Sequence, residues 1–256
     1  MIQNSSVSQD QQPEHRFSRT ELVVGRKGVE CLRSSHVVVF GLGGVGGYAV
    51  EALTRAGIGH LTLVDFDTFS TSNINRQLHA LDATVGQNKV YVVGKRCLEI
   101  NPQVELTQHL RRYSSESADV LLEPSYDYVV DCIDTISAKI DLIQQCSIRD
   151  LAIISSMGAA NKLDPTQVLV ADLFATEKCR LARIMRKELR KRGVESKVPV
   201  VYSREKYRPA ANARPAQPRV SGEDWQQPPL GSISTIPPLF GIMMAGVVVQ
   251  HLLGEV

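Results

Sequence analysis

The sequence predicts an α/β protein whose mostly parallel sheet is doubly wound, with a C-terminal extension that completes a mixed sheet. Two observations lead to this prediction. Short β-branched segments alternate with segments of helical periodicity along the chain, which is typical of a parallel sheet covered on both faces. A glycine-rich turn at residues 41–47 follows the first strand and opens a helix, as in Rossmann-like folds.

The elements follow from these patterns in chain order. The predicted strands are His36–Phe40, Leu61–Asp65, Val104–Leu110, Asp127–Asp131, Leu151–Ser155, Val168–Asp172 and Val198–Ser203. The predicted helices are Gly46–Ala56, Val85–Ile100, Thr135–Arg149, Ala175–Gly193 and Leu239–Leu253, with one or two helical turns within 18–34. The second helix ends before Asn101-Pro102, because the residue that precedes a proline resists the helical conformation.

The chain is expected to form one domain after a polar tail. Residues 1–15 are predicted to be disordered and residues 16–256 to fold together. Within that domain, residues 16–172 form the predicted nucleotide-binding core. Residues 173–256 supply a basic helix, a proline-rich crossing loop at Arg208–Gly231 and a C-terminal apolar helix.

Composition restricts the class of protein more than its partners. A net charge of +2 on 256 residues indicates no partner by itself. The five cysteines never form a C-x-x-C pair, which argues against a zinc knot and a disulfide framework and favours a reducing, cytoplasmic location. No secretory signal is present, and the apolar stretch Leu239–Leu253 is too short to cross a bilayer. We therefore expect no membrane partner.

The turn at 41–47 predicts a phosphate site. Its glycines let backbone N–H groups approach phosphate oxygens at a helix N-terminus, and Asp65 at the end of the next strand is placed to accept hydrogen bonds from ribose hydroxyls. The candidate glycines are Gly41, Gly43, Gly44 and Gly46. A structural turn is the alternative, and the loop alone does not distinguish NAD from ATP.

The polar residues that follow favour a triphosphate. Arg76 and Lys89 would hold phosphates and offset charge as pyrophosphate departs, and Asp67, Asn73 and Asn75 belong to the same cluster. Asp134 follows a later strand, where it could bind Mg²⁺ through oxygen. Its alternative is a helix N-cap, and the two roles are compatible.

Together these residues resemble the ThiF and ubiquitin-activating-enzyme superfamily of adenylate-forming enzymes. The resemblance rests on G-x-G-G-V-G, D-F-D, S-N-x-N-R-Q, the downstream lysine and D-x-x-D, over about residues 16–172. It implies that the loop glycines and Asp65 hold ATP, that Asn75, Arg76 and Lys89 engage its phosphates, and that Asp134 holds the metal. Arg16-Phe17-Ser18-Arg19 resembles an element whose second arginine enters the partner subunit's ATP site. The resemblance therefore implies a homodimer with Arg19 acting in trans, although a surface arginine without a role is the alternative.

Within that superfamily the chain resembles the tRNA threonylcarbamoyladenosine dehydratases. The matching segments are 154–166, Asp172-Leu173, Cys179, 181–193, Val201-Tyr202-Ser203 and Gly231-Ser232-Ile233-Ser234. The resemblance implies ATP-dependent cyclisation of the threonylcarbamoyl group on the adenosine 3′ to the anticodon. ATP would adenylate the threonine carboxylate, and the group's own carbamoyl moiety would then attack and release AMP.

Two features of the residues agree with a tRNA substrate. The helix at 175–193 predicts a basic stripe for a phosphate backbone, with Leu181, Ile184, Met185 and Leu189 facing the core. The residues expected on its solvent face are Arg183, Arg186, Lys187, Arg190 and Lys191. A solvated charged helix without a partner is the alternative. Secondly, an intramolecular cyclisation needs neither zinc pairs nor a thioester, and we interpret Cys179 as structural.

Three other functions stay open on the sequence alone. The first is an adenylyltransferase for the C-terminal carboxylate of a small sulfur-carrier protein. The second is an NAD-dependent oxidoreductase, which the Arg76 and Lys89 cluster disfavours. The third is a nucleotide-sensing adaptor without catalysis that relays sulfur-transfer partners, such as a cysteine desulfurase.

Overall fold

The computed structural model describes residues 14–195, 197–206, 208 and 230–255. Its centre is a seven-stranded sheet in the order β3-β2-β1-β4-β5-β7-β6. Every neighbouring pair is parallel except β6 and β7. The strands are β1 His36–Phe40, β2 His60–Val64, β3 Glu105–His109, β4 Tyr128–Asp131, β5 Ile153–Ser156, β6 Val168–Asp172 and β7 Pro199–Ser203. The predicted mostly parallel sheet, made mixed by the C-terminal part of the chain, is confirmed.

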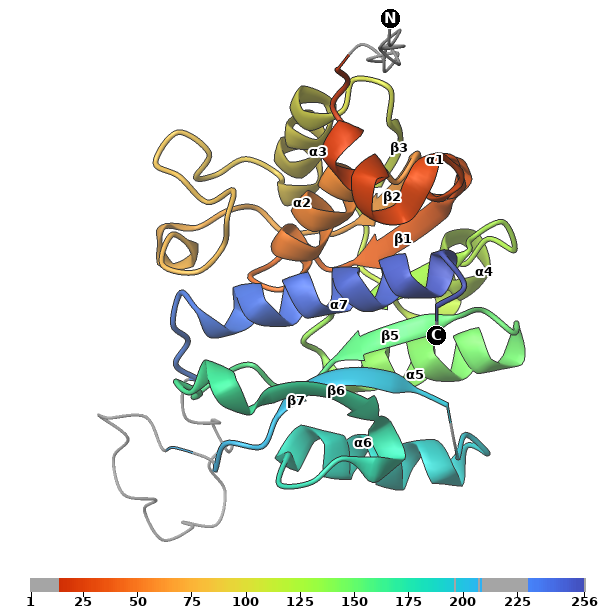
Figure 1. Cartoon of the computed structure of the whole chain (residues 1–256). Coiled ribbons are helices and arrows are strands. Elements are labelled where there is room, and N and C mark those ends of the chain that lie inside the picture. Colours follow the sequence, from red (N-terminus) through yellow and green to blue (C-terminus); the bar gives the residue numbers. More distant parts are fainter. Residues whose placement is uncertain (1–13, 196, 207, 209–229, 256) are drawn as a thin grey trace, which may run out of the picture.

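Helices cover both faces of this sheet (Figure 1). One face carries α1 Ser18–Ser34, α2 Gly46–Ala56, α3 Lys89–Ile100 and α7 Ile236–Leu252, and the other carries α4 Ala118–Leu121, α5 Ile136–Ile148 and α6 Arg180–Lys191. Each layer has its own cluster of buried apolar side chains. The sheet interior therefore excludes water on both sides, which explains why β1 is an unbroken apolar run after His36.

The helix α7 extends across the α2 layer (Figure 1). A Cβ built on Gly241 would lie only 2.2 Å from Val45 O, so α7 and the start of α2 are in close backbone contact there. The apolar C-terminal segment is thus a packed helix. No helix in the described ranges is both long and apolar enough to span a bilayer.

Two predicted helices begin later in the structure than the sequence suggested. The α3 helix starts at Lys89 rather than Val85, after a bridge between Thr68 and Asn88. The α6 helix starts at Arg180 rather than Ala175, because Leu173–Ala175 form a 3₁₀ turn that the Asp172 carboxylate caps at 2.7 Å from Phe174 N.

Other boundaries were wrong in the opposite direction. The α1 helix has 17 residues rather than one or two turns, and a left-handed Gly25 (φ 72°) kinks it. The α7 helix begins at Ile236, with Pro237 and Pro238 at its first positions, where a missing N–H costs nothing. The short α4 was not predicted. The predicted tail and crossing loop lie outside the described residues, apart from residues 14, 15, 208, 230 and 231.

Candidate active site

The predicted phosphate loop opens at the carboxyl ends of β1, β2 and β4. β1 pairs with β2 on one side and with β4 on the other, both in parallel. The chain leaves β1 through α2 on one face and leaves β4 through α5 on the opposite face. The loop and the turn after β4 therefore flank a topological switch point, the place where open α/β sheets bind ligands.

Two glycines of the loop are required by contact distances. Gly41 has φ +87°, and a Cβ there would lie 2.8 Å from Cys132 O. A Cβ on Gly46 would lie 1.8 Å from Gly41 O, which no side chain tolerates. By contrast, the nearest neighbour of a Cβ on Gly43 would be 3.7 Å away. The loop is therefore tight where it meets the strands and roomier at Gly43.

Asp65 fixes the loop from β2. Its Oδ2 accepts from Leu42 N at 2.6 Å and its Oδ1 accepts from Asp67 N at 2.7 Å. Burial raises the pKa of this carboxyl above its ordinary value, and the two backbone hydrogen bonds and nearby Lys89 partly offset that effect. Each oxygen keeps a lone pair for a further donor such as a ribose hydroxyl.

Lys89 is buried at the first position of α3. Its ammonium lies 3.1 Å from Asp67 Oδ2, and that carboxylate is about half exposed. A positive charge at a helix N-terminus is unfavourable on its own because the helix dipole is positive there. The Asp67 carboxylate compensates for this, and a phosphate oxygen could do the same.

The segment after Asp67 folds over the loop. Arg76 Cγ would lie 3.4 Å from a Cβ on Gly44, so the structure brings Arg76 beside the glycines. Arg76 Nη1 donates to Ser72 O at 2.8 Å and to Asn75 Oδ1 at 2.9 Å. Both bonds use Nη1, so Arg76 has further guanidinium N–H donors beyond these two bonds.

The two asparagines of this segment have local partners. Asn75 Nδ2 donates to Ser232 O at 3.0 Å, which ties the segment to the chain just before α7. Asn73 Oδ1 accepts from Ser70 N at 3.1 Å and caps the 3₁₀ turn Thr71–Asn73. The two amide groups therefore shape the 70–77 segment.

Asp134 lies exposed in the turn after β4. The alternative of a helix N-cap is wrong for it, because Thr135 occupies the N-cap position of α5. Its carboxylate accepts only a long contact from Thr135 Oγ1, at 3.5 Å. In the described part of the chain no three His, Cys, Asp or Glu side chains form a metal cluster. One carboxylate beside a phosphate loop suits Mg²⁺, which commonly binds through one or two carboxylates and substrate phosphates.

Arg19 is exposed on α1 and is not brought to this crevice. The start of α1 is anchored where strands begin, because Arg16 Nη1 donates to Ile100 O at 2.5 Å. The Phe17 ring would lie 3.3 Å from a Cβ on Gly57, the residue that ends α2. Both contacts are at the amino edge of the sheet, opposite the glycine loop.

In the basic helix α6, one residue of the predicted nucleic-acid set does not lie where it was expected. Arg186 was expected in solvent, but it is half-buried and donates to Thr176 O at 2.9 Å, Leu173 O at 3.4 Å and Thr176 Oγ1. The backbone carbonyls just before α6 therefore hold its guanidinium. Ile184 was expected in the core, but it is exposed and Ala182 is buried instead.

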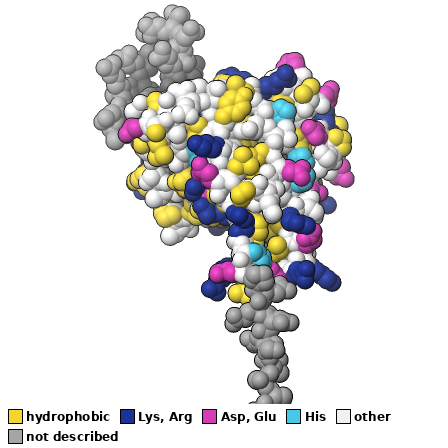
Figure 2. Space-filling model, turned by 90° about the horizontal axis from the view of Figure 1, so that it is seen from above, with side chains coloured by type: hydrophobic (Ala, Val, Ile, Leu, Met, Phe, Trp, Pro, Cys, Tyr) yellow, Lys and Arg dark blue, Asp and Glu magenta, His cyan; other side chains and the backbone are white. Residues whose placement is uncertain are grey.

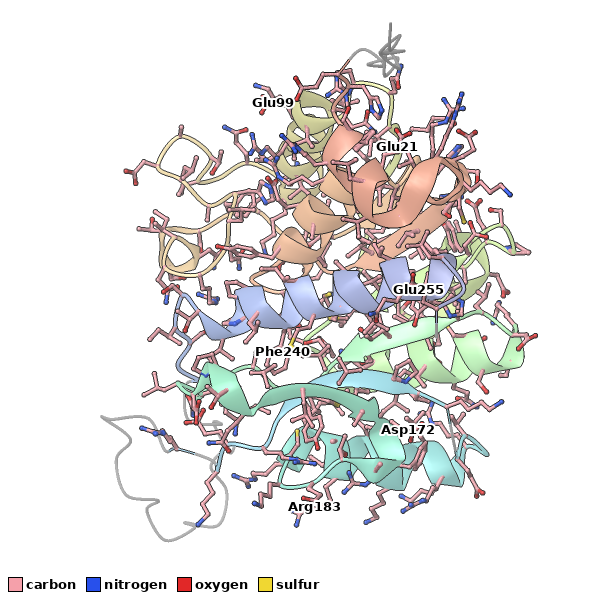
Figure 3. The ribbon with its side chains drawn as sticks, in the orientation of Figure 1. Glu21, Glu99, Asp172, Arg183, Phe240 and Glu255 are labelled. Carbon is pink, nitrogen blue, oxygen red and sulfur yellow. The ribbon has the colours of Figure 1, made fainter. Side chains whose placement is uncertain are left out.

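The remaining predicted residues of this set are exposed: Arg183, Lys187, Arg190 and Lys191. Figure 3 shows Arg183 on the outer side of α6. Arg190 lies over the Phe174 ring at 5.3 Å, and Lys191 pairs with Glu188 at 2.8 Å. Cys179 caps this helix through Sγ, which accepts from Ala182 N at 3.4 Å. The face near α1 and α3 instead mixes basic, acidic and apolar side chains (Figure 2).

Sequence reasoning missed two features beside the loop. Gln77 is buried near Gly43, and its Oε1 has no hydrogen-bond partner in the described structure. Such an orphaned acceptor in a ligand crevice fits an absent donor. Lys139 is fully buried against Asp131; the signal for it was a lysine at a core position of an amphipathic helix.

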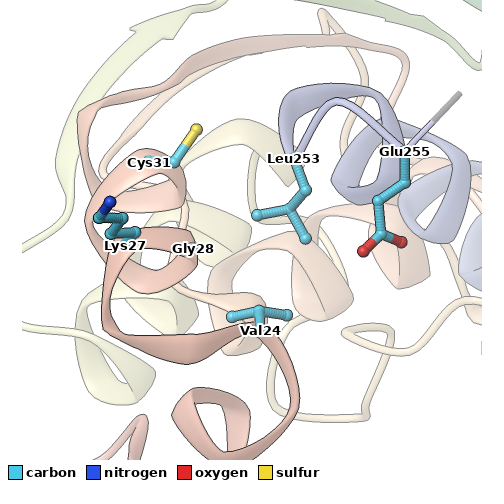
Figure 4. Close-up of a pocket in the computed structure, with 6 residues that line it drawn as sticks. All are labelled: Val24, Lys27, Gly28, Cys31, Leu253 and Glu255. Carbon is cyan, nitrogen blue, oxygen red and sulfur yellow. The ribbon is translucent and has the colours of Figure 1, made fainter.

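A pocket of about 350 Å³ lies elsewhere, between α1 and the end of α7 (Figure 4). Its lining residues are Val24, Lys27, Gly28, Cys31, Leu253 and Glu255. None of them belongs to the predicted site, so the pocket adds nothing to the crevice at the switch point.

Comparison with known proteins agrees with this geometry. The family model described as the ThiF family matches residues 17–256. The chain is 41% identical to a Bacillus subtilis tRNA threonylcarbamoyladenosine dehydratase over 246 residues, which are 94% of this chain and 96% of that protein. It is also similar to Escherichia coli tRNA N6-threonylcarbamoyladenosine dehydratase solved with AMP (30% identity, TM-score 0.81) and with ATP (29% identity, TM-score 0.82). Each match covers 94% of both chains. The chain therefore belongs to the ThiF family.

Proposed function

We propose that this protein is an ATP-dependent tRNA threonylcarbamoyladenosine dehydratase. The observation that carries the proposal is the 41% identity to a protein of that name along almost the whole of both chains. The crevice at the switch point supports it, because it joins a phosphate loop, a ribose acceptor and two cationic side chains.

In the first step, ATP activates the threonine carboxylate of the modified adenosine. The carboxylate oxygen attacks the α-phosphorus, and pyrophosphate leaves. Asp65 would accept from the ribose, and the loop N–H groups at Gly41–Gly46 would hold phosphate oxygens. Arg76 and Lys89, with Asn73, Asn75 and Asp67 around them, would bind the β- and γ-phosphates and stabilise the departing charge.

Asp134 would hold a Mg²⁺ ion against the phosphates. The ion would neutralise charge on the leaving pyrophosphate. The donor set fits, because Asp134 is exposed, has one long hydrogen bond and follows the strand next to the loop.

In the second step, the group's own carbamoyl moiety attacks the acyl carbon, and AMP leaves. The carbamoyl group loses a proton and the carboxylate loses an oxygen to AMP, so the nucleoside loses one water. No cysteine thioester is needed. The raised pKa values of Cys97, Cys132 and Cys146, caused mainly by burial, agree with unreactive thiols.

The tRNA would lie along α6. The exposed cations Arg183, Lys187, Arg190 and Lys191 would contact backbone phosphates. Arg186 is excluded from this set because its guanidinium is held by backbone carbonyls.

The assembly we propose is a cytoplasmic homodimer in which Arg19 acts in trans. Support comes from the position of α1 at the amino edge, too far round the sheet for Arg19 to serve its own loop. A mixed dimer would test this. One subunit carries Arg19→Ala and the other Asp65→Ala, and we expect partial recovery of activity when the two are mixed. If activity does not recover, the trans role is contradicted. A cysteine desulfurase as a sulfur-relay partner stays a prediction from the sequence.

The test of the reaction is direct. The protein is incubated with ATP, Mg²⁺ and tRNA that carries threonylcarbamoyladenosine. The tRNA is then digested to nucleosides, and their masses are measured by mass spectrometry. We expect the modified adenosine to lose one water and AMP to form in equal amount. An unchanged nucleoside mass, together with ATP–pyrophosphate exchange driven by a sulfur-carrier protein, would instead support the adenylyltransferase alternative.

A further inference from the structure

A fully buried ion pair lies directly behind the turn that carries Asp134. Lys139 on α5 and Asp131 at the end of β4 have no exposed side-chain area, and Lys139 Nζ lies 2.9 Å from Asp131 Oδ2. Ser155 Oγ on β5 donates to the same oxygen at 2.6 Å, and Ile133 N donates to Oδ1 at 3.1 Å. The Asp131 carboxylate is therefore engaged inside the protein and is not a ligand for anything in the crevice.

The Lys139 ammonium also holds the backbone of this turn. Its Nζ donates to Ile133 O at 3.0 Å and to Asp131 O at 3.5 Å. With the Asp131 carboxylate these make three acceptors, which match the three donors of an ammonium. On its other side the turn is bonded to the end of β1, just before the phosphate loop, since Cys132 N donates to Phe40 O at 2.8 Å. Cys132 O leaves no room for a Cβ on Gly41. The turn is thus fixed by Lys139 on one side and by its contacts with Phe40 and Gly41 on the other.

Stability alone does not account for this arrangement. A buried ion pair gives little net stability compared with an apolar pair of the same shape, because both charges lose their hydration. What the pair does supply is a single position for the backbone of residues 131–133. Asp134 comes next in the chain and has only the 3.5 Å contact to hold it. Its location therefore depends on the turn before it.

We infer that Lys139 is a positioning residue that sets the Asp134 carboxylate for a divalent metal bound with ATP. The inference rests on the proposed function, in which that metal lies between Asp134 and the phosphates. Groups behind a metal ligand typically change metal affinity by about 10- to 100-fold when they are removed. We expect an effect of that size on the metal, and none on ATP binding without metal.

The experiment removes both charges together, so that no buried charge is left unpaired. Asp131→Leu with Lys139→Met is compared with the wild-type protein, each bound to a non-hydrolysable ATP analogue. Mn²⁺ affinity is measured by electron paramagnetic resonance, and analogue affinity is measured separately in EDTA. We expect Mn²⁺ affinity to fall about tenfold or more, with analogue affinity in EDTA unchanged. Lys139→Arg keeps the charge and serves if the double variant does not fold. It should also weaken Mn²⁺, because a planar guanidinium cannot reproduce three contacts made by an ammonium.

A control on the same helix separates positioning from general loosening. Tyr113→Phe removes the 2.9 Å hydrogen bond from Tyr113 Oη to Asp141 Oδ2 on α5 and leaves the turn untouched. It should lower Tm without changing Mn²⁺ affinity. The positioning role is overturned if a folded variant of the pair binds Mn²⁺ as the wild type does, or if Tyr113→Phe weakens Mn²⁺ equally. If instead the wild-type complex binds no Mn²⁺, the metal step of the proposed function fails, which is a different result.

Discussion

Neutralising two exposed cations of α6 should weaken tRNA binding in a salt-dependent way. Arg183 and Lys187 are four residues apart and share one face of the helix. Each phosphate contact contributes about 0.7–0.9 to the slope of log K against log salt, which is roughly fivefold in affinity at 0.15 M salt. Arg183→Gln with Lys187→Gln should therefore reduce the slope by about 1.4–1.8 and weaken binding roughly 20-fold.

The assay is fluorescence anisotropy with labelled tRNA at several salt concentrations. Arg26→Gln with Lys27→Gln removes the same charge from exposed positions of α1, on the far side of the molecule from α6 (Figure 1). This control should leave the slope nearly unchanged.

Arg186→Gln should behave differently from both. It breaks hydrogen bonds to Thr176 and Leu173, so it should cost about 1–3 kcal/mol of stability and leave the slope intact. The reasoning is refuted if Arg183→Gln with Lys187→Gln leaves the salt slope at its wild-type value, or if Arg186→Gln reduces it.

Three further predictions concern the crevice and its surroundings. Gly46→Ala should lower the free energy of unfolding in urea by about 1–3 kcal/mol, because its Cβ would lie 1.8 Å from Gly41 O. Gly43→Ala should not lower it, and equal unfolding midpoints for the two variants would contradict this prediction. Burial raises the pKa of Asp65 above 3.8, so ATP affinity measured by calorimetry should fall on acidification before an ordinary aspartate titrates. The raised folded-state pKa also means that stability from this group is lost as pH rises through it, and an Asp65→Asn variant should lack both effects. Burial raises the pKa of Cys97 to about 11, so iodoacetamide at pH 8 should label it only after unfolding, by mass spectrometry; rapid labelling of the folded protein would refute the burial.

The order of elements was predictable because its signals are local. β1, α2 and β6 have the predicted bounds, since β-branched runs and a glycine turn specify them without reference to the rest of the chain. The positions of Gly41, Asp65 and Lys89 at one edge followed from the same logic, because parallel strands bring their carboxyl ends together. Their roles in binding ATP stay predictions.

Features set by tertiary neighbours were not predictable. Arg186 seemed equivalent to Arg183 on a helical wheel, but the turn at Leu173–Ala175 and the following Thr176 lie beside it, and the carbonyls of Leu173 and Thr176 accept from its guanidinium. Ile184 is exposed and Ala182 is buried, so the buried face of α6 is rotated from the one that the apolar spacing predicted. The spacing of Lys139 places it on the core side of α5. Nothing local in the sequence indicates that its ammonium contacts the Asp131 carboxylate and the carbonyls of Asp131 and Ile133.

The packing of α7 against α2 has a consequence for how the protein is made. Gly241 contacts Val45 across about 200 positions of sequence, and part of the apolar surface of α2 is buried only against α7. Contacts of such separation form late and slowly. During synthesis the nucleotide loop would emerge long before α7, so α2 would lack its contact with α7 until residues 236–252 leave the ribosome. A chain that lacks α7 should therefore expose an apolar surface that chaperones recognise, and it should not bind ATP.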